Sequence, residues 1–150
     1  MKIRTLNVLV PLMLYVFQQG CGPSISLFNE RAYNLATSLK VETVTLMDKA
    51  TEPFDKYAEQ VEMLTVNLKK AYEYAAGRAD NELSAEQWKI LIDPEKNLAG
   101  GFFKRWQEQQ TLNKIFIDEA RRGLIAPAFD LIIGLEAGKI KPEQAKIVGE

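Results

Sequence analysis

The sequence lacks histidine and contains a single cysteine, Cys21. Without histidine, neither a Ser-His-Asp triad nor the common histidine-based zinc site can be assembled. With one cysteine, no disulfide can form within the chain, so the fold must rely on its apolar core. Glycine patterns that bind phosphates or dinucleotides are also missing. We therefore expect no metal site and no cofactor, and the commonest catalytic arrangements are excluded.

The sequence also lacks a strong excess of charge, with 19 Lys and Arg against 20 Asp and Glu. This balance gives no electrostatic reason to expect DNA or RNA as a partner. A pair of carboxylates could still hydrolyse an envelope glycan, and Glu82, Glu86 and Asp93 flank the loops where a cleft would form. Acidic residues of a helical protein mostly form a solvated surface, so we expect no enzyme and keep the carboxylate-dependent enzyme as the alternative.

The first 20 residues form a segment of their own. Lys2 and Arg4 precede an uninterrupted apolar run over residues 8–17, and Gly20 and Cys21 follow. As a helix, this run would rise only about 15 Å, roughly half the thickness of the hydrocarbon core of a bilayer. The order of charged, apolar and small residues is typical of a signal peptide that is removed.

This segment resembles the lipobox signal of bacterial lipoproteins, over residues 1–21 only. The resemblance implies that the Cys21 thiol is joined to a diacylglycerol, that the chain is cut before Cys21 and that the new amine is acylated. The pattern departs from the family at Gln18, where a leucine is usual. Two other interpretations remain: an uncleaved apolar N-terminus with an incidental cysteine, or an ordinary secretory signal, whose best cleavage site places Pro23 just after the bond.

Cleavage before Cys21 would leave residues 21–150 as one lipid-anchored domain, with 17 cations and 20 anions. A domain of this size buries about two-thirds of the surface of its unfolded chain. Gly22 is not the aspartate that holds many lipoproteins of enteric bacteria at the inner membrane. The resemblance therefore implies the outer membrane, with the domain facing the periplasm.

Beyond Gly22 the sequence shows only helical periodicity. A first amphipathic helix is predicted over about residues 25–50, with Ser24 or Ser26 as its N-cap. Apolar side chains spaced three and four residues apart form its buried face. These residues are Phe28, Ala32, Leu35, Leu39, Leu46 and Ala50.

Pro53 interrupts this pattern and suits the first turn of a second helix, which Thr51 or Glu52 would cap and Gly77 would end. The two helices have similar lengths, so they predict an antiparallel hairpin. The alternative is a single kinked helix over 25–76, because the apolar phase nearly continues through the proline.

Three further helical stretches follow, over residues 85–92, 102–122 and 126–137. The first carries a capping-box pattern in Ser84 and Gln87, and the second is expected to break at residues 107–110, with Thr111 capping its continuation. The third would begin with Pro127 and end at Gly138. Residues 95–101, with their paired glycines, are expected to form a loop. No stretch alternates as a strand does, so the sequence predicts an all-α bundle built on the long hairpin with two or three further helices.

Aromatic and basic residues concentrate around the predicted loop at 95–101. We expect a protein-binding surface there that includes Trp88, Phe103, Arg105 and Trp106, because aromatic and arginine side chains carry much of the binding energy of interfaces. Phe102 and Phe103 lie about 100° apart on a helix, so at least one ring should remain exposed, and Phe103 is our candidate. The rings could instead all belong to the core.

These features together predict a lipid-anchored envelope protein without enzymatic activity. Its partners would be a membrane, through Cys21, and another envelope protein that it binds or positions.

Overall fold

The computed structural model describes residues 25–141 and residue 145. The predictions on the signal segment, Cys21 and Ser24 therefore lie outside the described residues. Within this part of the chain all regular structure is helical. The α-helices are α2 (Glu30–Met47), α3 (Ala58–Ala76), α4 (Glu82–Ile92), α5 (Ala99–Gln109), α6 (Lys114–Ala120) and α7 (Ala126–Glu136), with a 3-10 helix at Phe54–Lys56 and a π-helix at Arg121–Ile125.

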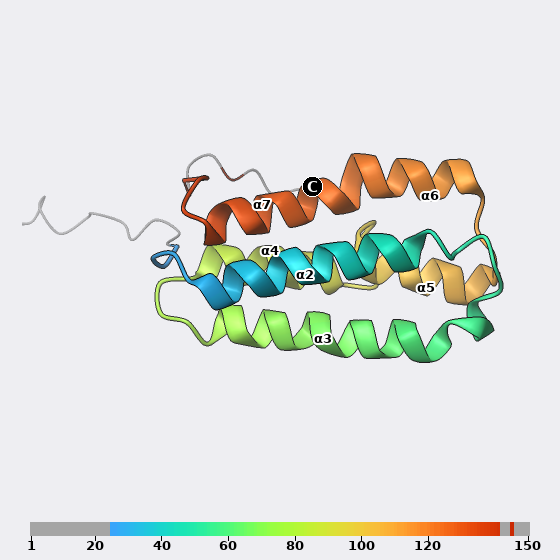
Figure 1. The fold of residues 1–150 in the computed structure, drawn as a ribbon, viewed down its shortest axis with the longest axis horizontal. Coiled ribbons are helices and arrows are strands. Elements are labelled where there is room, and N and C mark those ends of the chain that lie inside the picture. The colour runs from blue at the N-terminus through green and yellow to red at the C-terminus, as the bar shows by residue number, and fades with distance from the viewer. Residues whose placement is uncertain (1–24, 142–144, 146–150) are drawn as a thin grey trace, which may run out of the picture.

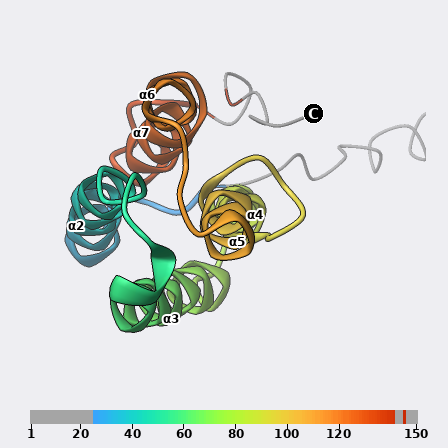
Figure 2. The same cartoon turned by 90° about the vertical axis from the view of Figure 1, so that its right-hand side faces the viewer.

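The helices form four antiparallel columns (Figures 1 and 2). α2 and α3 are the first two columns, α4 and α5 follow one another in the third, and α6, the π-helix and α7 form the fourth. α2 packs against α3 and α7, and α4 packs against the same two helices. The predicted all-α bundle and its antiparallel hairpin are thus confirmed, and the single kinked helix is wrong.

One main apolar cluster runs along the axis of the bundle. Its fully buried side chains include large residues from every column, among them Leu39, Leu68, Leu91, Trp106, Phe129 and Ile132. A second cluster lies where α4 begins and α7 ends, and it contains Leu83, Leu131 and Leu135. Ile25, which precedes α2, packs against this second cluster.

α2 begins later than predicted. Asn29 is its N-cap, because the Asn29 side chain accepts a hydrogen bond from the Ala32 N–H at 2.9 Å. Ser26 is not the cap, since its hydroxyl bonds to Asn81 instead. Phe28 therefore precedes the helix and is exposed, although its spacing placed it on the buried face.

The corner between α2 and α3 is joined to the corner between α5 and α6. The Phe54 N–H donates to the Gln110 carbonyl at 2.8 Å, and the Leu112 N–H donates to the Ala50 carbonyl at 2.7 Å. Pro53 precedes the 3-10 helix rather than α3, and Glu52 accepts the Tyr57 hydroxyl at 2.8 Å instead of capping a helix. The prediction of a chain reversal here was correct, whereas its capping residues were wrong.

The predicted loop at 95–101 is shorter than expected, because α5 begins at Ala99 and includes both glycines. A Cβ atom at Gly100 would lie 2.3 Å from the Ile92 carbonyl oxygen, and one at Gly101 would lie 1.9 Å from that of Lys96. The paired glycines thus allow the α4–α5 connection to fold closely against the first turn of α5.

The helix that was predicted over 102–122 breaks where expected. Gln110 has a φ of +62°, which ends α5. The side chain of Asn113, not that of Thr111, caps α6 by accepting the Ile115 N–H at 2.8 Å. Threonine and asparagine both suit an N-cap, and the residue at which α6 begins makes Asn113 the cap.

α6 continues into α7 through the π-helix, so the separate helix predicted from Ala126 is part of a longer column. The Ala126 N–H bonds to the Arg121 carbonyl, five residues earlier. This wider turn admits Pro127, which has no N–H to donate, within a continuous column. The column ends as predicted, at Gly138 with φ +67°.

Candidate functional site

Three of the four residues predicted to bind a partner lie in the core. Trp88, Phe103 and Trp106 are at most 5% exposed. The expectation that Phe103 remains exposed is therefore wrong. Trp88 packs edge-on against Phe129, and Phe103 packs edge-on against Phe102, with ring centroids 5.9 and 5.7 Å apart.

The rings of α5 are buried because they belong to the main apolar cluster and because α6 covers one of them. Phe102 stacks on Phe116 of α6 with centroids 6.0 Å apart, which covers a face that an isolated amphipathic helix would leave in solvent. The Trp106 indole N–H donates to the Glu52 carbonyl at 3.0 Å and to the Gln110 carbonyl at 3.1 Å. Trp106 thus closes the contact between the two corners at this end of the bundle.

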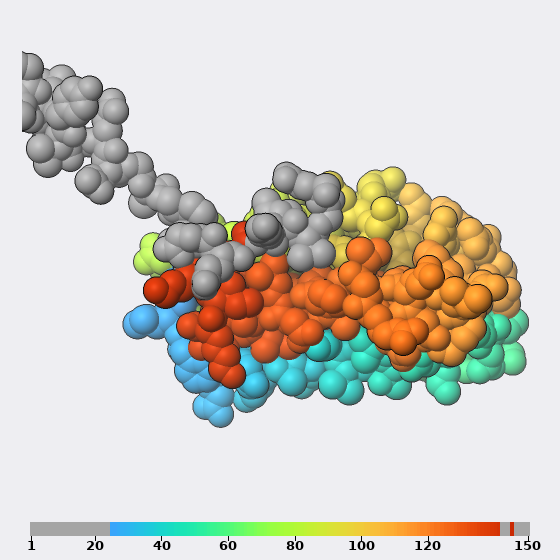
Figure 3. Space-filling model, turned by 90° about the horizontal axis from the view of Figure 1, so that it is seen from above, coloured from blue at the N-terminus to red at the C-terminus, as the bar shows by residue number. Residues whose placement is uncertain are grey.

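Arg105 is the exposed member of the predicted set and borders a shallow pocket of about 310 Å³. The pocket lies between the α4–α5 connection, α5 and α6, which are the yellow and orange parts of Figure 3. The Arg105 guanidinium carbon lies 4.7 Å from the centroid of Phe116, as in a cation–π pair. Lys104 donates to Glu95 at 2.6 Å, which raises the pKa of Lys104. Two of the three basic residues that line the pocket, Lys104 and Arg105, therefore already have partners within the protein.

A second surface, which we call the α2–α3 groove, is more apolar. Its volume is about 390 Å³, and its lining residues are Val41, Glu42, Thr45, Leu46 and Lys49 of α2 with its following turn, and Gln60, Met63, Leu64 and Asn67 of α3. Val41 is 58% exposed and Met63 is 56% exposed. These side chains are free to meet a ligand or a partner.

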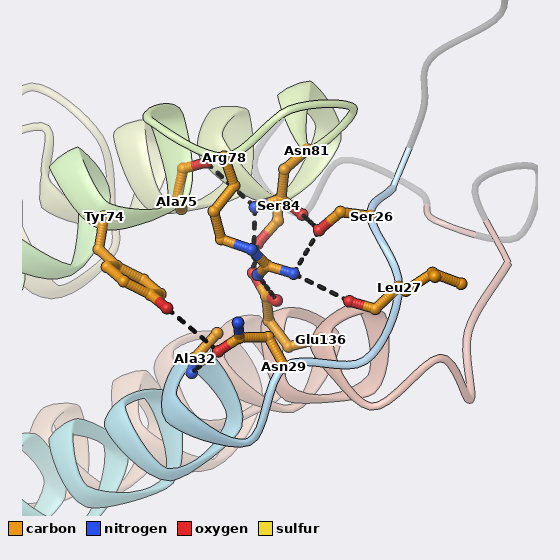
Figure 4. A network of polar contacts seen from close by, with 10 residues as sticks. All are labelled: Ser26, Leu27, Asn29, Ala32, Tyr74, Ala75, Arg78, Asn81, Ser84 and Glu136. Carbon is orange, nitrogen blue, oxygen red and sulfur yellow. Dashed lines mark hydrogen bonds and ion pairs between the residues drawn. The ribbon is translucent and has the colours of Figure 1, made fainter.

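A buried polar network lies at the opposite end of the bundle from Trp106 (Figure 4). At its centre is Glu136, the last residue of α7, which is 1% exposed. Its carboxylate pairs with the Arg78 guanidinium and accepts hydrogen bonds from the Ser84 hydroxyl and, at 3.3 Å, from the Asn81 side chain. A buried carboxylate requires such partners, because the interior does not solvate its charge. Ser84 is thus a partner of Glu136 and not the predicted helix cap.

The same network holds the segment that precedes α2. Arg78 donates to the Ser26 hydroxyl and, at 3.0 Å, to the Leu27 carbonyl. The Ser26 hydroxyl also donates to the Asn81 side-chain oxygen at 3.2 Å. Figure 4 shows the guanidinium of Arg78 between this segment and Glu136. The network therefore connects the start of α2, the α3–α4 connection and the end of α7.

The carboxylates that were considered for catalysis are not gathered in a pocket. Glu82 and Glu86 are exposed along α4, and the Asp93 carboxylate accepts the Glu95 N–H at 2.8 Å, as in an Asx turn. None of the three lines the pocket beside Arg105 or the α2–α3 groove. In the described part of the chain, no three acidic side chains are grouped so that they could hold a metal ion.

Neither the groove nor the polar network was predicted from the sequence, although each contains a residue whose position in the sequence pattern is unusual. Val41 and Met63 are apolar residues two positions away from Leu39 and Val61 of the buried faces, so they had no place in either core face. Glu136 is a lone carboxylate that follows a run of apolar residues. Its partners could not be found in the same way, since Arg78 and Ser84 lie more than 50 positions earlier.

These observations define an antiparallel four-helix bundle with short connections, an apolar groove on one face and a polar network at one end. The chain shows no significant similarity to any protein-family model, curated protein or solved structure with which it was compared. Within 25–141, no helix has both the length and the apolar character needed to cross a bilayer.

Proposed function

We propose that this protein is a lipid-anchored module of the bacterial envelope that binds and positions another envelope protein and does not catalyse a reaction. The lipobox-like signal that ends at Cys21 supports the anchor. Gly22 in place of aspartate supports the outer membrane, with the bundle in the periplasm. The observation that carries the binding role is the α2–α3 groove, where Val41 and Met63 are each more than half exposed.

The chemistry of the groove favours a partner that presents apolar side chains. Leu46 and Leu64 form part of its floor and are buried, so an inserted side chain would meet apolar atoms. Methionine is flexible and polarisable, so Met63 can adapt to the shape of a partner. Glu42 and Lys49 carry opposite charges at the rim, which suits a polar margin around an apolar contact.

Photo-crosslinking in intact cells tests this binding role. A photoreactive amino acid at Met63 should capture a distinct envelope protein, identified by mass spectrometry. The matched control is the same amino acid at Ile115, which is 68% exposed on α6 and lies outside the groove. Val41→Asp should abolish capture from position 63, because it places a charge in the apolar contact.

Equal capture of the same proteins from positions 63 and 115 would contradict binding in the groove. Capture that Val41→Asp leaves unchanged would contradict it as well. Circular dichroism of the Val41→Asp variant provides the control for folding, since Val41 is a surface residue.

A further inference from the structure

Two large apolar side chains are exposed next to the proposed anchor. Leu27 is 92% exposed and Phe28 is 59% exposed, and both lie within seven residues of Cys21. Their neighbour Ile25 behaves in the opposite way, because it packs against the cluster of Leu83, Leu131 and Leu135. The segment thus has one inward apolar residue and two outward ones.

The polar network keeps this segment in place on the bundle. Arg78 donates to the Ser26 hydroxyl and to the Leu27 carbonyl, so the backbone that carries the exposed side chains is held by hydrogen bonds. The buried Glu136 carboxylate pairs with the same guanidinium and thereby fixes Arg78 itself. The outward direction of Leu27 is therefore a property of the folded bundle and not of a free tail.

The length of chain between the anchor and this segment is short. Cys21 and Ile25 are four residues apart, which span at most about 14 Å when fully extended. An acylated Cys21 lies at the membrane surface, so the exposed pair must lie close to the same surface. Apolar side chains of membrane-associated segments lie about 5–10 Å deep, at the boundary between headgroups and acyl chains.

We propose that Leu27 and Phe28 insert into the lipid surface beside the anchor, so that the bundle stands on the membrane on the end that holds the Arg78–Glu136 pair. This inference rests on the proposed lipid anchor and adds the orientation of the body. Phenylalanine and leucine are typical of the apolar side of segments that lie in the interface.

Among the described residues, charge does not provide an alternative attraction at this end of the bundle. Arg31 and Lys139 are exposed there, but so are Glu30 and Asp80. Because both signs are present, binding should depend little on the fraction of anionic lipid. Among the described residues of this end, the exposed apolar pair therefore offers the stronger attraction to a lipid surface.

The orientation also places the α2–α3 groove away from the bilayer. α2 runs away from the end that carries Leu27 (Figure 1), and Val41 lies 11 residues beyond Glu30. Along a helix this separation corresponds to about 16 Å. The groove would thus stand clear of the headgroups, where a periplasmic partner can reach it.

Thiol accessibility in vesicles tests the orientation. The full-length lipidated protein is purified and reconstituted into vesicles of phosphatidylethanolamine and phosphatidylglycerol, so that no other protein can cover the segment. In a correctly lipidated chain the Cys21 sulfur is bound in a thioether, and a cysteine introduced at Leu27 is then the only free thiol. A membrane-impermeant maleimide reports its exposure, with each rate normalised to that of the same sample dissolved in sodium dodecyl sulfate.

We expect Leu27→Cys to react several-fold more slowly than Ile115→Cys, which lies near the opposite end of the bundle (Figure 1). Similar rates at positions 27 and 115 would overturn the inference while leaving the anchor intact. Strong protection at both positions would overturn it too, because the bundle would then lie against the membrane along its length. Maleimide labelling of the parent chain would show a free Cys21 and would contradict the proposed anchor itself, a distinct failure.

Discussion

At the scale of single residues, the Glu136 carboxylate is a charged group that is almost fully buried, so its burial costs free energy unless partners compensate the charge. It lies in the interior with Arg78, Ser84 and Asn81 as partners. Desolvation of two charges often offsets most of their mutual attraction, so the pair need not stabilise the fold more than apolar residues would. Removal of Arg78 is different, because the Glu136 charge then stays buried without the cation that it pairs with.

Arg78→Ala should therefore lower the free energy of unfolding by about 3–5 kcal/mol. The matched control is Lys40→Ala, which breaks the Lys40–Asp130 pair on the surface, where the Asp130 side chain is 60% exposed. That change should cost at most about 1 kcal/mol. Urea denaturation of residues 22–150 measures both values. Equal losses would contradict the claim that Arg78→Ala leaves the Glu136 charge buried without its cation.

The corner at Glu52 provides a prediction for pH. The hydrogen bond from the Tyr57 hydroxyl, with a smaller contribution from Lys56, lowers the pKa of Glu52 below its ordinary value of 4.5. A carboxylate whose pKa is lowered in the folded state stabilises the fold above the ordinary pKa, and this contribution is lost as the pH falls through the folded-state pKa.

The loss of stability caused by Tyr57→Phe should therefore be larger at pH 7 than in acid well below pH 4.5. Thermal melts at several pH values measure this difference. In a Glu52→Gln background the pH dependence of the Tyr57→Phe effect should disappear. A Tyr57→Phe effect that is constant with pH would contradict the ionised Glu52 as its source.

At the scale of elements, close backbone contacts explain what local sequence rules missed. The paired glycines predicted a loop, whereas both lie in the first turns of α5, next to the carbonyls of Ile92 and Lys96. Glycine weakens a helix on local grounds, and only the position of the preceding connection explains its presence.

Gly101→Ala should destabilise the bundle by roughly 1–3 kcal/mol, because its Cβ atom would lie 1.9 Å from a backbone oxygen and the connection would have to move. Gly123→Ala is the matched control, since its Cβ atom would have no neighbour within 4 Å. That change should stabilise the helix by roughly 0.4–1 kcal/mol. Chemical denaturation distinguishes the two, and stabilisation by both would show that the connection is not tightly packed against α5.

Helix ends were predicted better than helix starts. Gly138 and the break at Gln110 agree with expectation. Ser26 and Ser84 looked like caps, but their hydroxyls serve the polar network. A serine hydroxyl can cap a helix or bond to a residue far away in the sequence. The choice depends on which residues the fold brings near it.

At the scale of the whole molecule, periodicity was sufficient to predict the class of fold. The antiparallel hairpin followed from two apolar faces of similar length, one on each side of Pro53. The aromatic surface was not predictable in the same way, because both neighbouring rings are covered: Phe103 belongs to the main apolar cluster, and Phe102 stacks on Phe116 of α6. The exposed apolar residues of the α2–α3 groove, Val41 and Met63, are in turn ones that periodicity left unassigned.

The proposed anchor would decide which end of the bundle faces a membrane and whether the α2–α3 groove remains free for a partner. Its most direct test is metabolic labelling of intact cells with a fatty-acid analogue, followed by isolation of the protein. We predict that the parent chain carries the label and that Cys21→Ser, at equal abundance by immunoblot, carries none. A parent chain without label, or a Cys21→Ser variant that retains it, would contradict the lipid anchor.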